Sequence, residues 1–278
     1  MKHLLLLILS TITTGLFAQT DTTSSEGGQS RESAAVDPTA AQWSLQFAAE
    51  YKGDYKDDEI TEGVTRPEGG QGFYQFRFVA PMPKDEKFPI TLLPRLTLRF
   101  VQNAAGDYGY GQSDLFILGI AQEWSSGRWG LGPQINFPAT ANPGGFGNPN
   151  WGLGLAAAVT QRAFSDKLFM ALLLQQTWSH DQNGDTKPST LGINPTFVVQ
   201  MGKGFYAGNG DFVISYDWET SGWLVPIRLR LGKAWVRPTN TINAYVEVGT
   251  STPSSEWYGP AANTSVRVNF QWQIPVNL

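Results

Sequence analysis

Apolar and polar residues alternate with a period of two along most of the chain from Trp43 onward. The tail SVRVNFQWQIPVNL, residues 265–278, shows this most clearly, because every second residue from Val266 on is apolar. This period is that of a β-strand, whose successive side chains point to opposite faces. The pattern fits a soluble barrel or sandwich with an apolar core, and equally a barrel that turns its apolar face to lipid.

Segments of this kind recur about twelve times and predict an all-β chain. The expected strands centre on residues 43–51, 74–80, 95–100, 113–124, 128–137, 151–160, 168–178, 191–200, 214–218, 223–231, 242–248 and 265–278. Many of them exceed the roughly 5–6 residues of an average strand and match the roughly 9–11 that cross a bilayer. An even strand number is typical of bacterial membrane barrels. The phasing is least regular in 113–124.

The connections between the expected strands alternate in length. From a periplasmic N-terminus, the odd connections should be long outer loops and the even ones short turns. Long connections fall at 52–70, 103–112, 138–150, 180–189 and 250–262, and short ones at 125–127, 162–166 and 236–240. The stretches 81–89, 202–211 and 219–222 follow this rule less well. Trp and Tyr residues of the apolar face lie mostly near strand ends, as in the aromatic girdles of membrane barrels.

These patterns predict a transmembrane antiparallel up-and-down β-barrel of about twelve strands over residues 41–278. Residues 1–18 combine a basic start with a short apolar run, which predicts a signal peptide. Residues 19–40 are rich in Ser, Thr, Gly, Gln and acids, so we expect a disordered periplasmic lead-in. The tail 265–278 is expected to close the barrel against the first strand.

Composition narrows the functional classes. The chain has no cysteine, which excludes a disulfide framework, thiolate chemistry and a lipoprotein anchor. A net charge of -4 argues against nucleic-acid binding. After residue 18 no continuous apolar run is long enough for a membrane helix, so any membrane crossing must be made by strands.

The second half of the chain carries the motifs WGLGPQINFPAT, WGLGLAAAV, QQTWSHD, INPTFVVQ and GWLVPIRLRLGKAW. With the tail, they resemble a family of bacterial outer-membrane proteins labelled as phenol meta-cleavage pathway proteins or transporters, and sometimes misnamed neuromedin U. The resemblance covers residues 129–278. It implies an outer-membrane β-barrel that passes small molecules. It implies no particular substrate and no catalytic residues.

Features that could carry catalysis or bind a ligand or metal are few. His180 is the one histidine after the signal region, and its neighbour Ser179 would point to the opposite strand face, a poor geometry for catalysis. The Gly-x-Gly-x-Ala sequence at 152–156 lies within a strand, which predicts small lumen-facing residues and not a dinucleotide site. The acidic stretches 52–62 and 181–185 lack the order of a calcium loop. We expect no enzyme activity, cofactor or protein-built metal site.

The alternation also places charged residues on the polar face, which is the lumen of a membrane barrel. This face carries Arg77, Arg95, Arg99, Arg228, Arg230, Arg267, Glu50, Asp217 and Glu247, and also Asp114, whose phase the alternation does not fix. A charge facing lipid near the midplane would cost about 2–4 kcal/mol, so the fold requires these residues inside. Two interpretations stay open: an arginine–carboxylate network that fills a narrow barrel, or an anion-favouring pore or ligand site.

The sequence thus favours an outer-membrane channel or transporter for small solutes, which the family resemblance suggests are aromatic or anionic. A non-conducting barrel that presents its outer loops is the main alternative, and a lipid-modifying enzyme is a weaker one. The expected partners are outer-membrane lipid, lipopolysaccharide, the barrel assembly machinery and the solute, with no nucleic acid.

Overall fold

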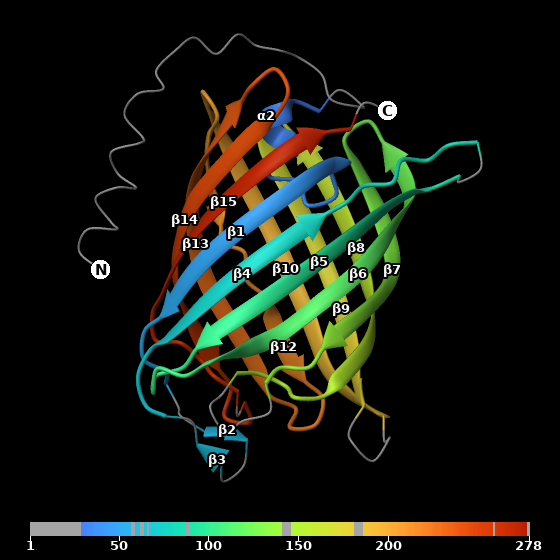
Figure 1. The fold of residues 1–278 in the computed structure, drawn as a ribbon. Coiled ribbons are helices and arrows are strands. Elements are labelled where there is room, and N and C mark those ends of the chain that lie inside the picture. The colour runs from blue at the N-terminus through green and yellow to red at the C-terminus, as the bar shows by residue number, and fades with distance from the viewer. Residues whose placement is uncertain are drawn as a thin grey trace.

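The computed structural model describes residues 29–276 except 57–58, 62–63, 66, 87–88, 141–145, 181–185 and 258. Its main sheet closes into an antiparallel barrel (Figure 1). The wall contains β1 (Gln42–Lys52), β4 (Gln71–Val79), β5 (Thr91–Gln102), β6 (Tyr108–Trp124), β7 (Gly127–Phe137), β8 (Trp151–Ala163), β9 (Leu168–His180), β10 (Thr186–Gly202), β11 (Phe205–Asn209), β12 (Ile214–Asp217), β13 (Trp223–Val236), β14 (Thr241–Pro253) and β15 (Ser265–Pro275). A separate small hairpin consists of β2 (Glu59–Thr61) and β3 (Val64–Thr65). The expected all-β class is confirmed.

The sheet contains 13 strands, but β11 and β12 share one position in the wall. Both pair with β10 on one side and with β13 on the other. They form one wall strand that is interrupted at residues 210–213, so the barrel has twelve positions, as predicted. The first and last strands pair from Gln42↔Pro275 to Lys52↔Ser265. The tail therefore closes the barrel where the sequence placed it.

The outer face of the wall is apolar and the inner face is polar. Leu229 on the outside is 68% exposed, whereas the adjacent inward position on β14 is Glu247, which is 1% exposed. A water-soluble barrel would show the reverse arrangement, because its core must be apolar. Since a closed barrel also pairs the backbone polar groups of its wall, this fold satisfies both requirements of a lipid environment. Within the described residues, no helix is long and apolar enough to cross a membrane.

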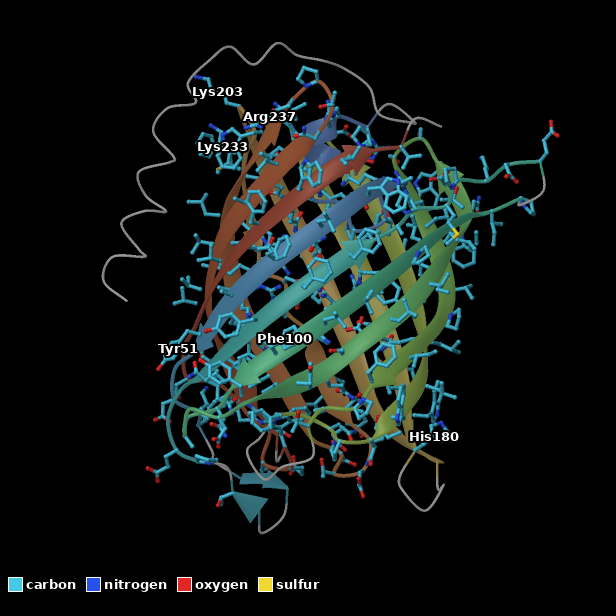
Figure 2. The ribbon with its side chains drawn as sticks, viewed as in Figure 1. Tyr51, Phe100, His180, Lys203, Lys233 and Arg237 are labelled. Carbon is cyan, nitrogen blue, oxygen red and sulfur yellow. The ribbon has the colours of Figure 1, made fainter. Side chains whose placement is uncertain are left out.

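Aromatic and basic side chains mark the two rims of the outer surface. Tyr51 and Phe100 point outward at the same end of the barrel (Figure 2). Lys203, Lys233 and Arg237 gather at the other end (Figure 2). The ammonium group of Lys233 lies 4.2 Å from the centroid of the Phe205 ring. Amphipathic rings and long basic chains of this kind suit the boundary between lipid tails and water.

The two ends of the barrel differ in their connections. At the turn end, where β1 begins and β15 ends, residues 125–126, 164–167 and 237–240 form short turns. At the loop end, the connections 53–70, 138–150 and 254–264 are long. Figure 1 shows helix α2 and the end of β15 at the turn end and the β2–β3 hairpin at the loop end.

Two connections expected to be long are shorter in the structure. Strand β6 begins at Tyr108 and β10 at Thr186, which leaves 103–107 and 181–185 between strands. The register of β6 shifts twice, opposite Thr97/Arg99 on β5 and again between Ile120 and Gln122. These bulges move residues between faces, and they explain why the alternation of 113–124 is irregular.

Residues 29–40 depart from the predicted lead-in, because they are folded inside the turn end and not disordered. We call this segment the plug. It contains helix α2 (Arg31–Ala34), whose N-cap Ser30 accepts a hydrogen bond from the Ser33 backbone N–H. Val36 packs in a buried cluster with Phe169, Val198, Tyr206 and Tyr245. Residues 1–28, which include the predicted signal peptide, lie outside the described residues.

The composition of the plug misled the prediction for a physical reason. A polar segment with few apolar residues cannot form a core by itself. Here the barrel supplies partners: the side chains of Asn243 and Gln273 both donate to the Ala35 carbonyl, each at 3.0 Å. Gln42 donates to the Ala34 carbonyl at 2.9 Å. The polar inner wall therefore satisfies backbone groups that an isolated segment would leave to water.

Candidate functional site in the barrel lumen

Strand register places a row of opposite charges across four neighbouring strands. Glu50 on β1 lies directly beside Arg267 on β15, Arg267 beside Glu247 on β14, and Glu247 beside Arg230 on β13. Directly opposed residues in antiparallel strands are close enough to interact. Arg230 donates from Nε to Glu247 at 2.9 Å, and Arg267 Nη1 lies 3.8 Å from Glu50. Arg228, one inward position from Arg230, donates to Glu50 at 2.6 Å.

A second group of charges lies on β4, β5 and β6. Arg99 donates to Asp114 at 2.8 Å and to the Gln112 carbonyl at 2.6 Å. Asp114 is thus an inward residue, which the irregular phase of β6 left undecided. Arg77 lies 3.4 Å from Asp211, and it also donates to Gln46 at 3.4 Å. This side of the lumen is richer in arginine than in carboxylates of its own.

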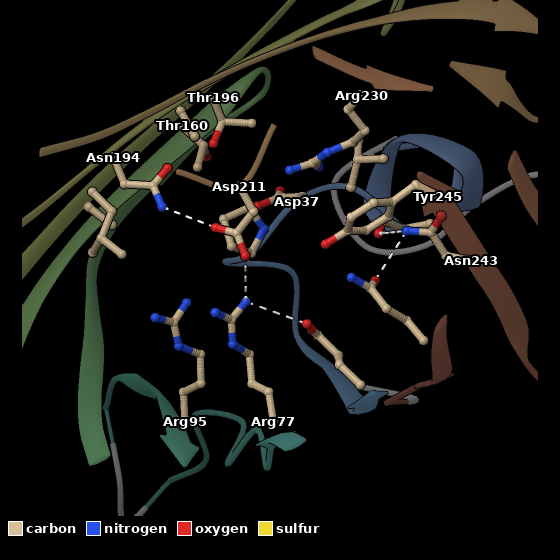
Figure 3. Close-up of a pocket in the computed structure, with 18 of the residues that line it drawn as sticks. Asp37, Arg77, Arg95, Thr160, Asn194, Thr196, Asp211, Arg230, Asn243 and Tyr245 are labelled. Atoms are coloured by element: carbon tan, nitrogen blue, oxygen red, sulfur yellow. Dashed lines mark hydrogen bonds and ion pairs between the residues drawn. The ribbon is translucent and has the colours of Figure 1, made fainter. Parts of the chain in front are cut away.

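Asp211 joins the two groups, and the sequence analysis missed it. It lies in the 210–213 interruption between β11 and β12, where the chain turns into the lumen. Its backbone N–H donates to Glu247 at 2.7 Å, and its carboxylate accepts from Asn194 at 3.2 Å. The same carboxylate lies 3.4 Å from Arg77 (Figure 3) and 3.5 Å from Arg267. The only sequence signal was a loss of alternation around NGD, which gives no direction for the side chain.

Two charged residues, Lys52 and Asp217, lie elsewhere than the sequence predicted. Lys52 was assigned to an outer connection, but β1 extends to it, and its ammonium lies 4.0 Å from the centroid of the Phe73 ring. Asp217 was predicted to line the lumen with the arginines. It instead accepts hydrogen bonds from the backbone N–H groups of Glu219 and Thr220, at 2.8 and 3.2 Å. It therefore stabilises the turn after β12 and is not part of the charge cluster.

The lumen cluster carries more positive than negative charge. Its cations are Arg77, Arg95, Arg99, Arg228, Arg230, Arg267 and Lys52, and its carboxylates are Glu50, Asp114, Asp211 and Glu247. Seven cations against four anions leave an excess of three positive charges, although the whole chain is acidic at -4. Within a lumen of low dielectric, such an excess attracts anions.

Arg95 differs from the other five predicted arginines. The residue is 9% exposed, and its guanidinium lies 4.0 Å from the centroid of the ring of Phe116, its direct neighbour on β6. Among the described residues, no carboxylate approaches it within the 4.0 Å that defines the ion pairs of the other arginines. Its Nε atom is buried without a hydrogen-bond partner in that part of the chain, a feature that it shares with Arg77, Arg228 and Arg267.

A cavity of about 80 Å³ lies between the plug and this cluster (Figure 3). Its three walls differ in polarity and charge. The plug contributes residues 35–38, the arginine side contributes Arg77, Arg95 and Arg230 with Asp211, and β8 and β9 contribute small or apolar side chains. The cavity is therefore cationic on one side and apolar on another.

Polar contacts hold the plug in the turn end. Arg128 on β7 donates to the Thr39 carbonyl and to Gln29, each at 3.1 Å, and lies 3.8 Å from Asp37. Arg31 donates to the Arg237 carbonyl and to Thr241. These contacts are hydrogen bonds and an ion pair more than apolar packing, so water can replace many of them.

The weak catalytic candidate has the geometry that the sequence suggested. Ser179 and His180 are consecutive in β9, so their side chains point to opposite faces. Ser179 accepts a hydrogen bond from Asn148 at 3.2 Å. In the described parts of the chain, no three His, Asp or Glu side chains cluster as metal ligands do. The acidic stretch 181–185 lies outside the described residues.

Comparison with known proteins supports the fold. No family model and no curated protein matches the chain. Among solved structures, it is similar to an outer membrane channel from Pseudomonas putida F1, with a TM-score of 0.60 and 14% identity over 86% of this chain and 100% of that one. It is also similar to the NanC porin, with a TM-score of 0.51 and 8% identity over 84% of this chain and 100% of that one. The chain is thus a transmembrane β-barrel with the fold of outer-membrane channels and porins.

Proposed function

We propose that this protein is an outer-membrane channel for small anionic solutes. The observation that carries the proposal is the excess of three positive charges in a lumen whose wall is apolar outside and polar inside. A barrel that served only as a rigid anchor would not need unbalanced buried charge, which is costly to the fold. The surplus becomes useful when an anion occupies the lumen.

In this proposal the turn end faces the periplasm and the loop end faces outward. The plug occupies the turn end, so a solute passes only when residues 29–40 shift or leave. Outer-membrane lipid, lipopolysaccharide and the barrel assembly machinery are the proposed partners. The aromatic solutes suggested by the family resemblance need a displaced plug, because the cavity of about 80 Å³ is smaller than the roughly 150 Å³ that accommodates benzene in an engineered protein.

The occupied turn end also favours a second candidate, a non-conducting barrel that presents its outer loops. Conductance in a planar bilayer separates the two. We expect few openings from the whole protein and frequent anion-selective openings from a variant that lacks residues 29–40. A deletion variant that is folded, as judged by heat-modifiable migration on gels, and still fails to conduct would favour the interaction barrel.

A further inference from the structure

We propose that the cavity beside Arg95 binds the carboxylate of a small aliphatic acid, of acetate to butyrate size. The inference rests on the proposed channel, because it names the class of solute that the lumen holds. Arg95 would contact the carboxylate, and the opposite wall would contact the short hydrocarbon part of the solute.

The first support is the charge of the cavity lining. It includes Arg77, Arg95 and Arg230 and the two acids Asp37 and Asp211. Four of these five have partners: Arg77 lies 3.4 Å from Asp211, Arg230 lies 2.9 Å from Glu247, and Arg128 lies 3.8 Å from Asp37. Arg95 is the one left over in this lining. The site is therefore short of one negative charge.

The second support is the burial of Arg95. Arg95 is only 9% exposed, and a buried charge without a counter-charge destabilises the fold. The Phe116 ring covers one face of the group and leaves its N–H edge for an acceptor. A carboxylate can accept two parallel hydrogen bonds from such an edge. Figure 3 shows Arg77 and Arg95 side by side, both reaching towards the centre of the cavity.

The position of Asp211 limits where the anion can lie. The Asp211 carboxylate lies 3.4 Å from Arg77 and 3.5 Å from Arg267, and it accepts a hydrogen bond from Asn194. A second carboxylate would be repelled by it, so the anion is expected beside Arg95, away from Asp211. This geometry favours a single monocarboxylate over a dicarboxylate.

The third support is the shape and polarity of the remaining walls. Ala158, Ala171 and Leu173 form an apolar side of the cavity. They can cover a short alkyl group, whereas a fully hydrated inorganic ion gains nothing from them. A volume of about 80 Å³ exceeds the roughly 10–15 Å³ needed for one water molecule and falls short of the roughly 150 Å³ that accommodates benzene. A short aliphatic acid fits between these limits.

Isothermal titration calorimetry on the whole protein, folded in detergent, tests the proposal with acetate, butyrate, benzoate and the neutral alcohol butanol at constant chloride. We expect acetate and butyrate to bind and benzoate and butanol to give no binding heat. Arg95→Gln should weaken acetate binding about tenfold or more, the effect of losing a charge-assisted hydrogen bond. Lys233→Gln is the control for the loss of one positive charge, because Lys233 lies at the outer rim (Figure 2), outside the cavity lining and the lumen cluster, and should leave acetate affinity unchanged.

A second variant keeps every charge in place. Ala171→Leu extends an apolar side chain into the cavity, and we expect it to abolish butyrate binding. This variant tests the site even if Arg95→Gln does not fold. Acetate binding that survives both changes, or benzoate binding as strong as that of acetate, would overturn the proposal. Calorimetry does not require conduction, so acetate binding at Arg95 in a barrel that never conducts would contradict the channel alone.

Discussion

Two sides of the lumen carry similar residues but match their charges differently. On β13, β14, β15 and β1, every arginine has a glutamate within 4.0 Å, and each glutamate is shared between two arginines. On β4, β5 and β6, Arg99 has Asp114, Arg77 depends on Asp211 from the strand interruption, and Arg95 has no carboxylate at this distance among the described residues. On the first side every arginine has a carboxylate partner, whereas the second side leaves Arg95 without one at this distance among the described residues.

The difference follows from register. Glu50, Arg267, Glu247 and Arg230 are direct cross-strand neighbours, so pairing strands in the correct register also pairs these charges. The direct neighbour of Arg95 on β6 is the aromatic residue Phe116. A protein that needed only a filled lumen would gain from a carboxylate there. The missing carboxylate is consistent with a site for a mobile anion.

The largest expected effect comes from truncating β15, the strand that closes the barrel against β1. Deleting residues 270–278 removes six of the eleven residue pairs of β15 with β1 and four of its nine pairs with β14. Unpaired backbone groups at a sheet edge are very costly in lipid, so we expect no assembled barrel. Fractionation and heat-modifiable migration measure this, and normal outer-membrane levels of the truncated chain would show that the barrel closes elsewhere.

The next effect tests the matched side itself. Glu247→Ala leaves Arg230 without its partner and removes the acceptor of the Asp211 N–H. Breaking a buried ion pair in this way costs about 3–5 kcal/mol in the free energy of unfolding. Urea titration of the folded gel band can measure the loss. A loss below about 1 kcal/mol in the free energy of unfolding would mean that water, and not Glu247, stabilises the charges of these arginines.

A smaller effect is expected where the two sides meet. Asp211→Asn keeps a hydrogen-bonding side chain next to Asn194 but removes the charge that faces Arg77 and Arg267. We expect a loss of about 1–3 kcal/mol and a shift of the reversal potential towards stronger anion selectivity in the plug-deleted channel. Unchanged selectivity would place Asp211 away from the ion path.

The smallest effect on stability should come from the unmatched side. Arg95→Gln removes a buried charge that has no carboxylate partner among the described residues, so the free energy of unfolding should change by no more than about 0.5 kcal/mol or should rise. Anion selectivity in the plug-deleted channel should nevertheless fall. Arg99→Gln serves as the comparison, because it leaves Asp114 without its ion-pair partner and should lower the free energy of unfolding. Equal destabilisation by both changes would mean that the charge of Arg95 is compensated in the folded protein as well as that of Arg99.

The sequence alone predicted the strands and the residues that face the lumen. Alternation with a period of two depends only on local backbone geometry, so Arg77, Arg95, Arg99, Arg228, Arg230, Arg267, Glu50 and Glu247 could all be assigned inward from their spacing. Strand length and aromatic placement then favoured lipid over water on the apolar face. The signal peptide and the family label stay predictions.

Only the tertiary structure decided which of these charges are matched and what fills the turn end. Asp211 enters the lumen because a wall strand is interrupted, and its partners Arg77 and Arg267 come from distant parts of the sequence. The plug folds because Asn243 and Gln273, more than 200 residues away, satisfy the Ala35 carbonyl. The contacts of Asp211 and those of the plug both reach across the closed barrel. They can form only after the first and last strands have paired.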